Sequence, residues 1–108
     1  SNGSVEYRSY KSGQRDMESV RHTLEKIKGS IYVFYSRALD EHPDISGSFI
    51  FRMAILPSGK VINLELVSSE LELDNLEQRM LSRIKQVDFG SEEVSTTNVE
   101  YTYHFFPS

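Results

Sequence analysis

The stretch from Gly47 to Ser69, which reads GSFIFRMAIL, then PSG, then KVINLELVSS, decides the fold of this chain. Two apolar, β-prone runs flank a Pro-Ser-Gly turn, and this pattern is typical of a β-hairpin. Pro57 sets φ for the first turn position, and Gly59 accepts the positive φ at which the chain reverses. Because an isolated hairpin is only marginally stable in water, other segments must cover one of its faces.

The alternation of side chains constrains the register of this hairpin. The residues that should share the core face are Phe49, Phe51, Met53 and Ile55 in the first strand and Ile62, Leu64 and Leu66 in the second. A regular three-residue loop would pair Met53 with Asn63, whereas a shift by one residue pairs Met53 with Leu64. We therefore predict either a four-residue connection through Lys60 or a β-bulge near Val61–Asn63.

The composition bounds the class of protein. The chain has 108 residues, enough for one domain with its own core and too few for two. It has no cysteine, which excludes a disulfide and a thiolate metal site. A net charge of −4 argues against nucleic acid as a ligand. The sequence has no signal peptide and no run of about 20 apolar residues that could cross a membrane.

Motifs that carry catalysis are missing. The sequence contains no nucleophile elbow, no phosphate-binding loop and no Gly-x-Gly-x-x-Gly fingerprint. Its three histidines are far apart, without the spacing of metal ligands. The run DEHPD at 40–44 looks like a metal cluster, but its place after a helix predicts a solvated loop. We therefore expect no enzyme, no cofactor and no metal site.

An apolar stripe in steps of three and four predicts a long helix from Asp16, as N-cap, to about Glu41, before Pro43. Gly29-Ser30 is a weak point, and two outcomes stay open: the helix bends there and wraps the domain, or its first half seeks another surface. The simplest expectation is that the apolar stripe of this helix packs on the protein's own sheet. The same spacing also fits a dimer seam. The candidate seam residues are Met17, Val20, Leu24 and Ile27.

The remaining segments complete the pattern. Residues 1–14 are polar and are expected to be a disordered lead-in, or residues added for expression, before a domain at 15–108. Asp74 and Glu77 predict a capping box for a second helix over about 75–87. Residues 88–98 are expected to form an exposed loop. Val99 to Phe106 alternates apolar and polar residues and predicts a third strand.

These elements predict an α+β two-layer sandwich in the order α-β-β-α-β, with two helices on one face of a three-stranded antiparallel sheet. The third strand cannot enter between two strands joined by a tight turn, so it should lie at an edge with one row of backbone groups unpaired. Such an edge is a template for adding a strand from a partner. The candidate partner-binding residues are Val99, Glu100, Tyr101, Thr102, Tyr103, His104, Phe105 and Phe106.

Several short segments carry a resemblance to a known family. They are Arg37-Ala38-Leu39, His42-Pro43, Ser46-Gly47, Pro57-Ser58-Gly59-Lys60-Val61, Val67-Ser68-Ser69, Leu81, Arg83-Ile84, Phe89, Tyr101, Tyr103, Phe105 and Pro107. In this order and spacing the chain resembles the C-terminal domain of TonB-family proteins, and within it the AgmX/PglI type. Domains of that type often carry a cysteine before the first-helix tyrosine and another in the second helix. Those positions correspond here to Phe34 and Arg79. Val87 stands at a position where the family often has an aromatic residue.

The resemblance implies a periplasmic domain of an inner-membrane-anchored protein in a Gram-negative bacterium, with a role in TonB-like energy transduction or transport. The implied partners are an outer-membrane receptor or another envelope protein, and an ExbB/ExbD-type motor acting through an upstream segment. TonB itself adds a receptor peptide to its sheet edge, which matches the edge expected above.

Two other functions stay open from the sequence. The first is an AgmX/PglI-like oligomerisation module of an envelope or motility complex, with a homodimer formed through the first helix. The second is a cell-wall or small-ligand binder, which would use Arg52, Tyr32 or Tyr35.

Overall fold

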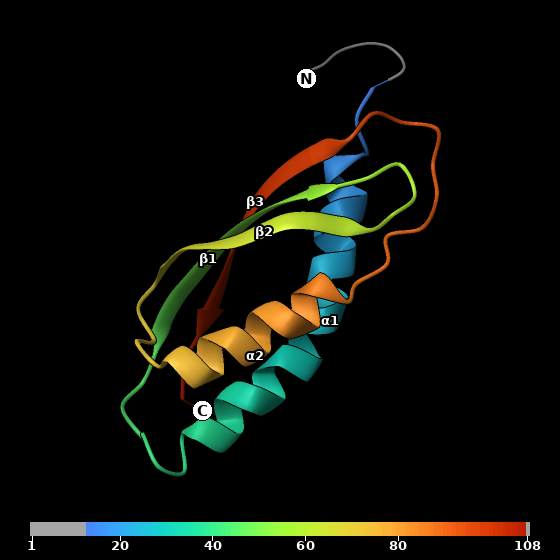
Figure 1. The fold of residues 1–108 in the computed structure, drawn as a ribbon. Helices are drawn as coiled ribbons and strands as arrows, with labels where there is room; N and C mark the ends of the chain where they lie inside the picture. The colour runs from blue at the N-terminus through green and yellow to red at the C-terminus, as the bar shows by residue number, and fades with distance from the viewer. Residues whose placement is uncertain (1–12, 108) are drawn as a thin grey trace.

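Five elements follow one another in the order that the sequence predicts. The structure, a computed structural model, describes residues 13–107. The elements are α1 (Met17–Ala38), β1 (Gly47–Ile55), β2 (Val61–Ser69), α2 (Asp74–Lys85) and β3 (Thr97–Phe105) (Figure 1). The strands form one antiparallel sheet in the order β2-β1-β3. The predicted fold class is therefore confirmed. The expected disordered lead-in falls mostly on residues 1–12, outside the described residues.

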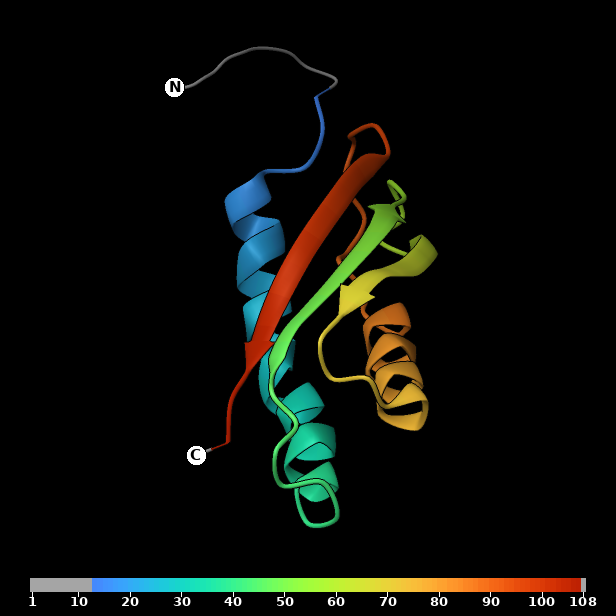
Figure 2. The same ribbon diagram turned by 90° about the vertical axis from the view of Figure 1, so that its left-hand side faces the viewer.

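The two helices cover the same face of the sheet, α1 under β3 and α2 under β2 (Figure 2). The core between the layers is rich in aromatic side chains, with Tyr35, Phe49, Phe51, Tyr103 and Phe105 almost fully buried. Their rings contact one another across the strands at centroid separations of 5.2 to 6.4 Å. This spacing is typical of stabilising aromatic pairs.

The hairpin contains the bulge that its sequence predicts. Leu56 donates its N–H to the Lys60 carbonyl at 2.9 Å, so the connection itself has three residues. Ile55 lies opposite Val61, whereas three residues earlier Arg52 lies opposite Glu65, so the strand pairing has shifted by one. The extra residue is in β2, where Asn63 adopts a φ of 54°. The bulge thus keeps Leu64 and Leu66 on the core face despite the short loop. The core-face prediction for Ile62 is wrong: before the bulge the buried residue is Val61, opposite Ile55, whereas Ile62 pairs with Ala54 on the other face.

The first helix is shorter than predicted. Asp16 takes the N-cap position as expected, but its carboxylate accepts from the Ser19 hydroxyl at 3.3 Å and caps no backbone N–H. The predicted end near Glu41 is wrong: α1 ends at Ala38, because the next residues tighten into a turn in which Glu41 donates to the Ala38 carbonyl at 3.2 Å.

Of the two outcomes left open at Gly29-Ser30, the helix continues and bends. The Ser30 hydroxyl donates to the Ile27 carbonyl at 2.8 Å, a contact that commonly bends helices. Figure 1 shows α1 changing direction near its middle while it stays against the domain.

The predicted capping box of α2 is wrong. The helix begins at Asp74, with Leu73 at the N-cap position and no side-chain cap. Glu77 is buried, and its carboxylate reaches back to accept the Glu72 N–H at 3.1 Å. This bond holds Glu72 in a turn with φ of 57° before the helix. Asp74 instead lies in the first turn, where the helix dipole favours its charge.

Candidate functional site

The candidate partner-binding strand lies at an edge of the sheet. β3 spans Thr97–Phe105, so it starts two residues before the predicted Val99, and Phe106 follows its end. The alternation is as predicted: Val99, Tyr103 and Phe105 are buried, whereas Glu100 and His104 are exposed on the outer face. The strand therefore presents one face to the core, one face to solvent and one rim away from β1.

The two edges of this sheet differ in regularity. β3 pairs with β1 through nine consecutive residues without a register shift. β2, at the opposite edge, has two irregularities, the bulge around Asn63 and a second one where Val67 has no partner in β1. Bulges twist an edge and interrupt its ladder of backbone groups, which protects it from adding a strand. The rim of β3 is thus the better template of the two.

The outer rim of β3 is unpaired within the described residues. None of the backbone hydrogen bonds that residues 13–107 make outside the regular helices and strands uses a backbone group of residues 98–105. One edge of a sheet can bind an extended peptide only if these N–H and C=O groups are available.

Two tyrosines attach β3 to α1. Tyr103 donates its hydroxyl to the Leu24 carbonyl at 2.5 Å in a buried contact, and Tyr101 donates to the Glu25 carboxylate. Burial raises the pKa of Tyr103, and burial together with the Glu25 hydrogen bond raises the pKa of Tyr101 to about 12. Both tyrosines are therefore neutral donors at physiological pH. These two contacts hold the edge strand on α1.

The solvent side of β3 carries charge and one apolar residue. Arg52 of β1 lies between Glu65 of β2 at 3.1 Å and Glu100 of β3 at 3.4 Å, all three exposed. Such exposed pairs stabilise weakly. At the end of the strand His104 and Phe106 stack with ring centroids 6.3 Å apart, and Phe106 is 61% exposed. This ring lies where an added strand would begin or end.

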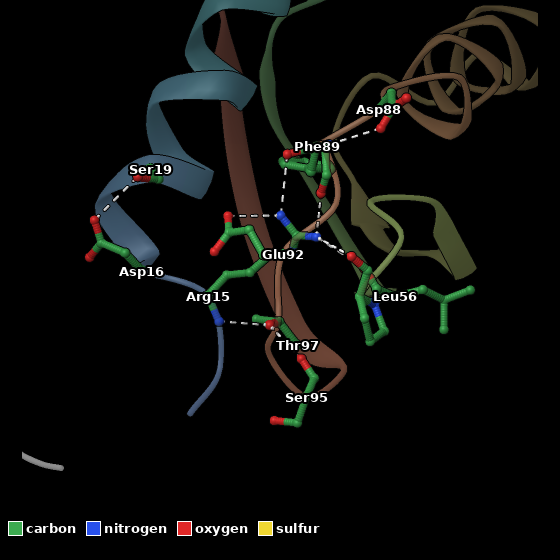
Figure 3. Close-up of polar contacts among 11 residues, drawn as sticks. Arg15, Asp16, Ser19, Leu56, Asp88, Phe89, Glu92, Ser95 and Thr97 are labelled. Carbon is green, nitrogen blue, oxygen red and sulfur yellow. Dashed lines mark hydrogen bonds and ion pairs between the residues drawn. The ribbon is translucent and has the colours of Figure 1, made fainter. Parts of the chain in front are cut away.

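The sequence analysis missed Arg15, which holds the start of β3 in place (Figure 3). Arg15 is only 4% exposed. Its backbone N–H donates to the Thr97 hydroxyl at 3.0 Å, and its guanidinium donates to the carbonyls of Phe89 at 3.2 Å and Gly90 at 2.6 Å. It also forms an ion pair with Glu92 at 3.1 Å. No local pattern identifies such an arginine, because its partners lie 41 to 82 positions away.

The same guanidinium ties the hairpin tip to the loop before β3. It donates to the carbonyls of Leu56 and Pro57 at 3.1 Å each. The two segments also bond directly, through the Phe89 N–H to the Gly59 carbonyl at 2.9 Å. Gly59 has a φ of 97°, and a Cβ there would lie 2.5 Å from the Gly90 nitrogen. The loop predicted as simply exposed is thus anchored at one end, and Thr97 is fully buried.

The candidate dimer seam is divided by the fold. Val20 and Leu24 are buried in the protein's own core, and Ile27 packs against it. Met17, 51% exposed, is the one member on the surface. A seam made of all four residues is therefore wrong, because two of them pack on the protein's own sheet. Dimerisation itself stays a prediction.

Of the residues considered for a small-ligand site, Tyr32 and Tyr35 lie together, with ring centroids 5.5 Å apart, but Arg52 does not join them. Tyr35 is fully buried, and its hydroxyl donates to the Ile45 carbonyl at 2.6 Å. Burial raises its pKa. Arg52 lies on the exposed outer face of the sheet, whereas Tyr32 lies on α1, where its ring is 6.5 Å from that of Phe105. These side chains therefore do not form one site.

Two absences hold for residues 13–107. No group of three or more His, Asp or Glu side chains in this range is arranged to hold a metal ion. Neither helix there combines the length and the apolar character needed to cross a bilayer.

Comparison with known proteins places the fold. The chain has the fold of a TonB C-terminal domain. One solved structure that it matches is the NMR solution structure of the C-terminal domain of Helicobacter pylori TonB, with a TM-score of 0.53. The match covers 78% of this chain and 79% of that chain at 22% sequence identity. No family model and no curated protein matches the chain. The fold implied by the resemblance is thus confirmed, whereas its AgmX/PglI subtype stays a prediction.

Proposed function

We propose that this domain is a periplasmic protein-interaction module that binds an extended peptide of an envelope protein by adding it as a fourth strand to β3. The observation that carries the proposal is the contrast between the two sheet edges. The rim of β3 follows nine regular pairs, whereas β2 is bulged twice. A regular, unpaired rim offers backbone donors and acceptors in register, which supplies the affinity of strand addition.

The side chains around the rim support an extended ligand. An added strand would place alternate side chains toward the outer face, beside Glu100 and His104, and toward α1, beside Tyr101 and Glu25. Phe106 offers an apolar contact at one end. Because β3 is fixed to α1 by two tyrosine hydroxyls, the template is rigid before the ligand binds, which lowers the entropic cost of binding.

The cellular role follows from the resemblance and belongs to the same proposal. It implies a domain anchored upstream in the inner membrane, coupled to an ExbB/ExbD-type motor and acting on an outer-membrane receptor or another envelope protein. The AgmX/PglI subtype has one further support. The two positions where such domains often carry cysteines are Phe34 and Arg79, and both line the same groove between α1 and α2. Paired positions are expected to be neighbours in this way.

The test is an NMR titration of the domain with peptides from the periplasmic ends of candidate receptors. We expect amide shifts along Thr97–Phe105 and little change along Val61–Ser69, so that β2 serves as the internal control. The matched control is the same peptide methylated at alternate backbone nitrogens, in both phases of alternation. One phase removes the N–H groups that face β3, and it should abolish binding.

Two results would contradict strand addition. One is a set of shifts confined to the helices and the outer face, with none along β3. The other is unchanged binding of both methylated peptides, since a ligand that binds through side chains alone does not need its backbone donors.

A further inference from the structure

A second surface lies between the two helices, away from the sheet edge. An open groove of about 630 Å³ runs between the end of α1 and the start of α2, with Phe34 and Arg37 on one side and Leu76 and Arg79 on the other. A second hollow of about 620 Å³ continues from it along α2 to Gln86 and shares Phe34 and Arg79. Since α2 rises 1.5 Å per residue, the combined groove is about 20 Å long.

The arginines of the domain divide into two sets. Arg15, Arg21 and Arg52, which lie outside this groove, each form an ion pair with a glutamate. The other set lines the groove, and its guanidinium groups make no hydrogen bond or ion pair with another residue of 13–107. Its members are Arg37, Arg79 and Arg83. In a chain of net charge −4, three guanidinium groups without an ion pair along one groove mark a place for negative charge.

The charge is not uniform along the groove. Glu41 and Asp74 line the end near the start of α2. The part along α2 has no carboxylate in its lining, which combines Arg79 and Arg83 with amide and hydroxyl side chains above the half-buried ring of Phe34. Guanidinium groups bind carboxylates through two parallel hydrogen bonds, and the side-chain amides of the lining can form hydrogen bonds with a peptide backbone. An anionic ligand is therefore favoured at the Arg79–Arg83 end.

We propose that this groove is a second docking site, which takes an acidic amphipathic segment of a protein partner. The carboxylates of the segment contact Arg79 and Arg83, and an apolar side chain packs on Phe34. A length of about 20 Å and a mixed lining suit a peptide segment better than a single phosphate group. A bilayer surface is disfavoured, since lipid-binding patches gather four to eight basic residues and this groove has three arginines and two carboxylates. The site is independent of strand addition at β3.

The probe for the test is a fluorescein-labelled, acetylated peptide of 12 residues with leucine at every third or fourth position and glutamate elsewhere. Its control has glutamine in place of each glutamate. We expect the acidic peptide to bind, with amide shifts along Asn75–Gln86 and near Phe34, and the glutamine peptide to bind at least tenfold more weakly. Arg79→Glu and Arg83→Glu should each weaken binding about fivefold, because each turns a surface attraction into a repulsion.

The matched control variant is Lys26→Glu, an exposed charge reversal on α1 outside the groove lining. It should leave the dissociation constant unchanged, and circular dichroism should show all three variants folded. The proposal is overturned if the acidic peptide does not bind, or if its amide shifts appear along β3. It is also overturned if Lys26→Glu weakens binding as much as Arg79→Glu. Arg79-dependent binding of phosphatidylglycerol vesicles, without binding of the peptide, would overturn it in favour of a membrane surface.

Discussion

Arg15 is expected to contribute more to stability than any other charged side chain of this domain. Its guanidinium donates to four backbone carbonyls, of which two have a second donor: Leu56 also accepts from Gly59, and Pro57 from the Glu92 N–H. The other two, on Phe89 and Gly90, accept no other hydrogen bond within residues 13–107. Substitution of Arg15 therefore leaves two carbonyls without a donor.

The magnitude follows from these contacts. Each orphaned carbonyl costs about 1–2 kcal/mol, and the ion pair with the half-exposed Glu92 adds about 0.5 kcal/mol. Arg15→Met keeps most of the packing of the aliphatic stem and removes the donors, so we expect it to lower the free energy of unfolding by about 3 kcal/mol. For a domain of this size the corresponding fall in Tm is on the order of 15 °C.

The assay is urea unfolding followed by circular dichroism, with Arg21→Met as the matched control. Arg21 is exposed and its ion pair is with Glu18 one turn away on the same helix, so its loss should lower the free energy of unfolding far less than Arg15→Met does. Hydrogen exchange adds a local readout, since the Phe89 and Glu92 amides, which bond to the hairpin tip, should lose protection in Arg15→Met. A loss below about 1 kcal/mol, with both amides still protected, would show that the guanidinium does not hold the loop.

Three other expectations are open to direct measurement. Gly59→Ala should destabilise the domain by about 2 kcal/mol or more, because the residue has a φ of 97° and its new Cβ would lie 2.5 Å from a backbone nitrogen. Gly29→Ala, in the middle of α1 and with no neighbouring atom within 4 Å of its new Cβ, should instead stabilise the domain by about 0.5–1 kcal/mol. Equal effects of the two substitutions in urea unfolding would contradict this. Tyr103→Phe should cost about 1–2 kcal/mol by removing a buried hydrogen bond. Because the pKa of Tyr103 is raised, the contribution of its hydroxyl to stability is complete below pH 10 and is lost as the pH rises toward the folded pKa. An absorbance titration at 295 nm should find Tyr103 still protonated at the pH where a free tyrosine ionises. Hydrogen bonds from the Ser48 N–H and hydroxyl lower the pKa of Glu70. The contribution of Glu70 to stability is therefore present above the ordinary glutamate pKa and is lost as the pH falls through the folded value. Carboxyl NMR should show a lowered titration midpoint for Glu70 that rises in Ser48→Ala, and an unchanged midpoint would refute the contact.

Sequence patterns were most informative where the cause is local. The five elements, their order, the antiparallel sheet and the bulge in β2 all follow from alternation, helical spacing and turn residues between Asp16 and Phe105. The errors lie at ends of elements. The last turn of α1 and the start of α2 were misplaced by one to three residues, because backbone groups at helix ends can bond to several nearby partners. The Glu72 N–H, for example, bonds to the Glu77 carboxylate.

The candidate site divides in the same way. That β3 lies at an edge could be derived from chain connectivity, since a strand cannot enter a tight hairpin. That its rim is regular, and that the opposite edge has a second irregularity at Val67, required the observed pairing. The burial of Tyr35 and the separation of the four seam residues also depend on how α1 lies over the sheet.

By itself the sequence determined the elements and the face that each turns to the core, because hydrophobic burial acts on a periodicity that neighbouring residues share. Only the tertiary structure decided what Arg15 does and which arginines gather between the helices. The acceptors of Arg15 are mostly main-chain carbonyls, which every residue carries and which therefore leave no mark in the sequence. The charge of a groove likewise depends on side chains that two packed helices bring together, and no spacing along one chain segment records that meeting.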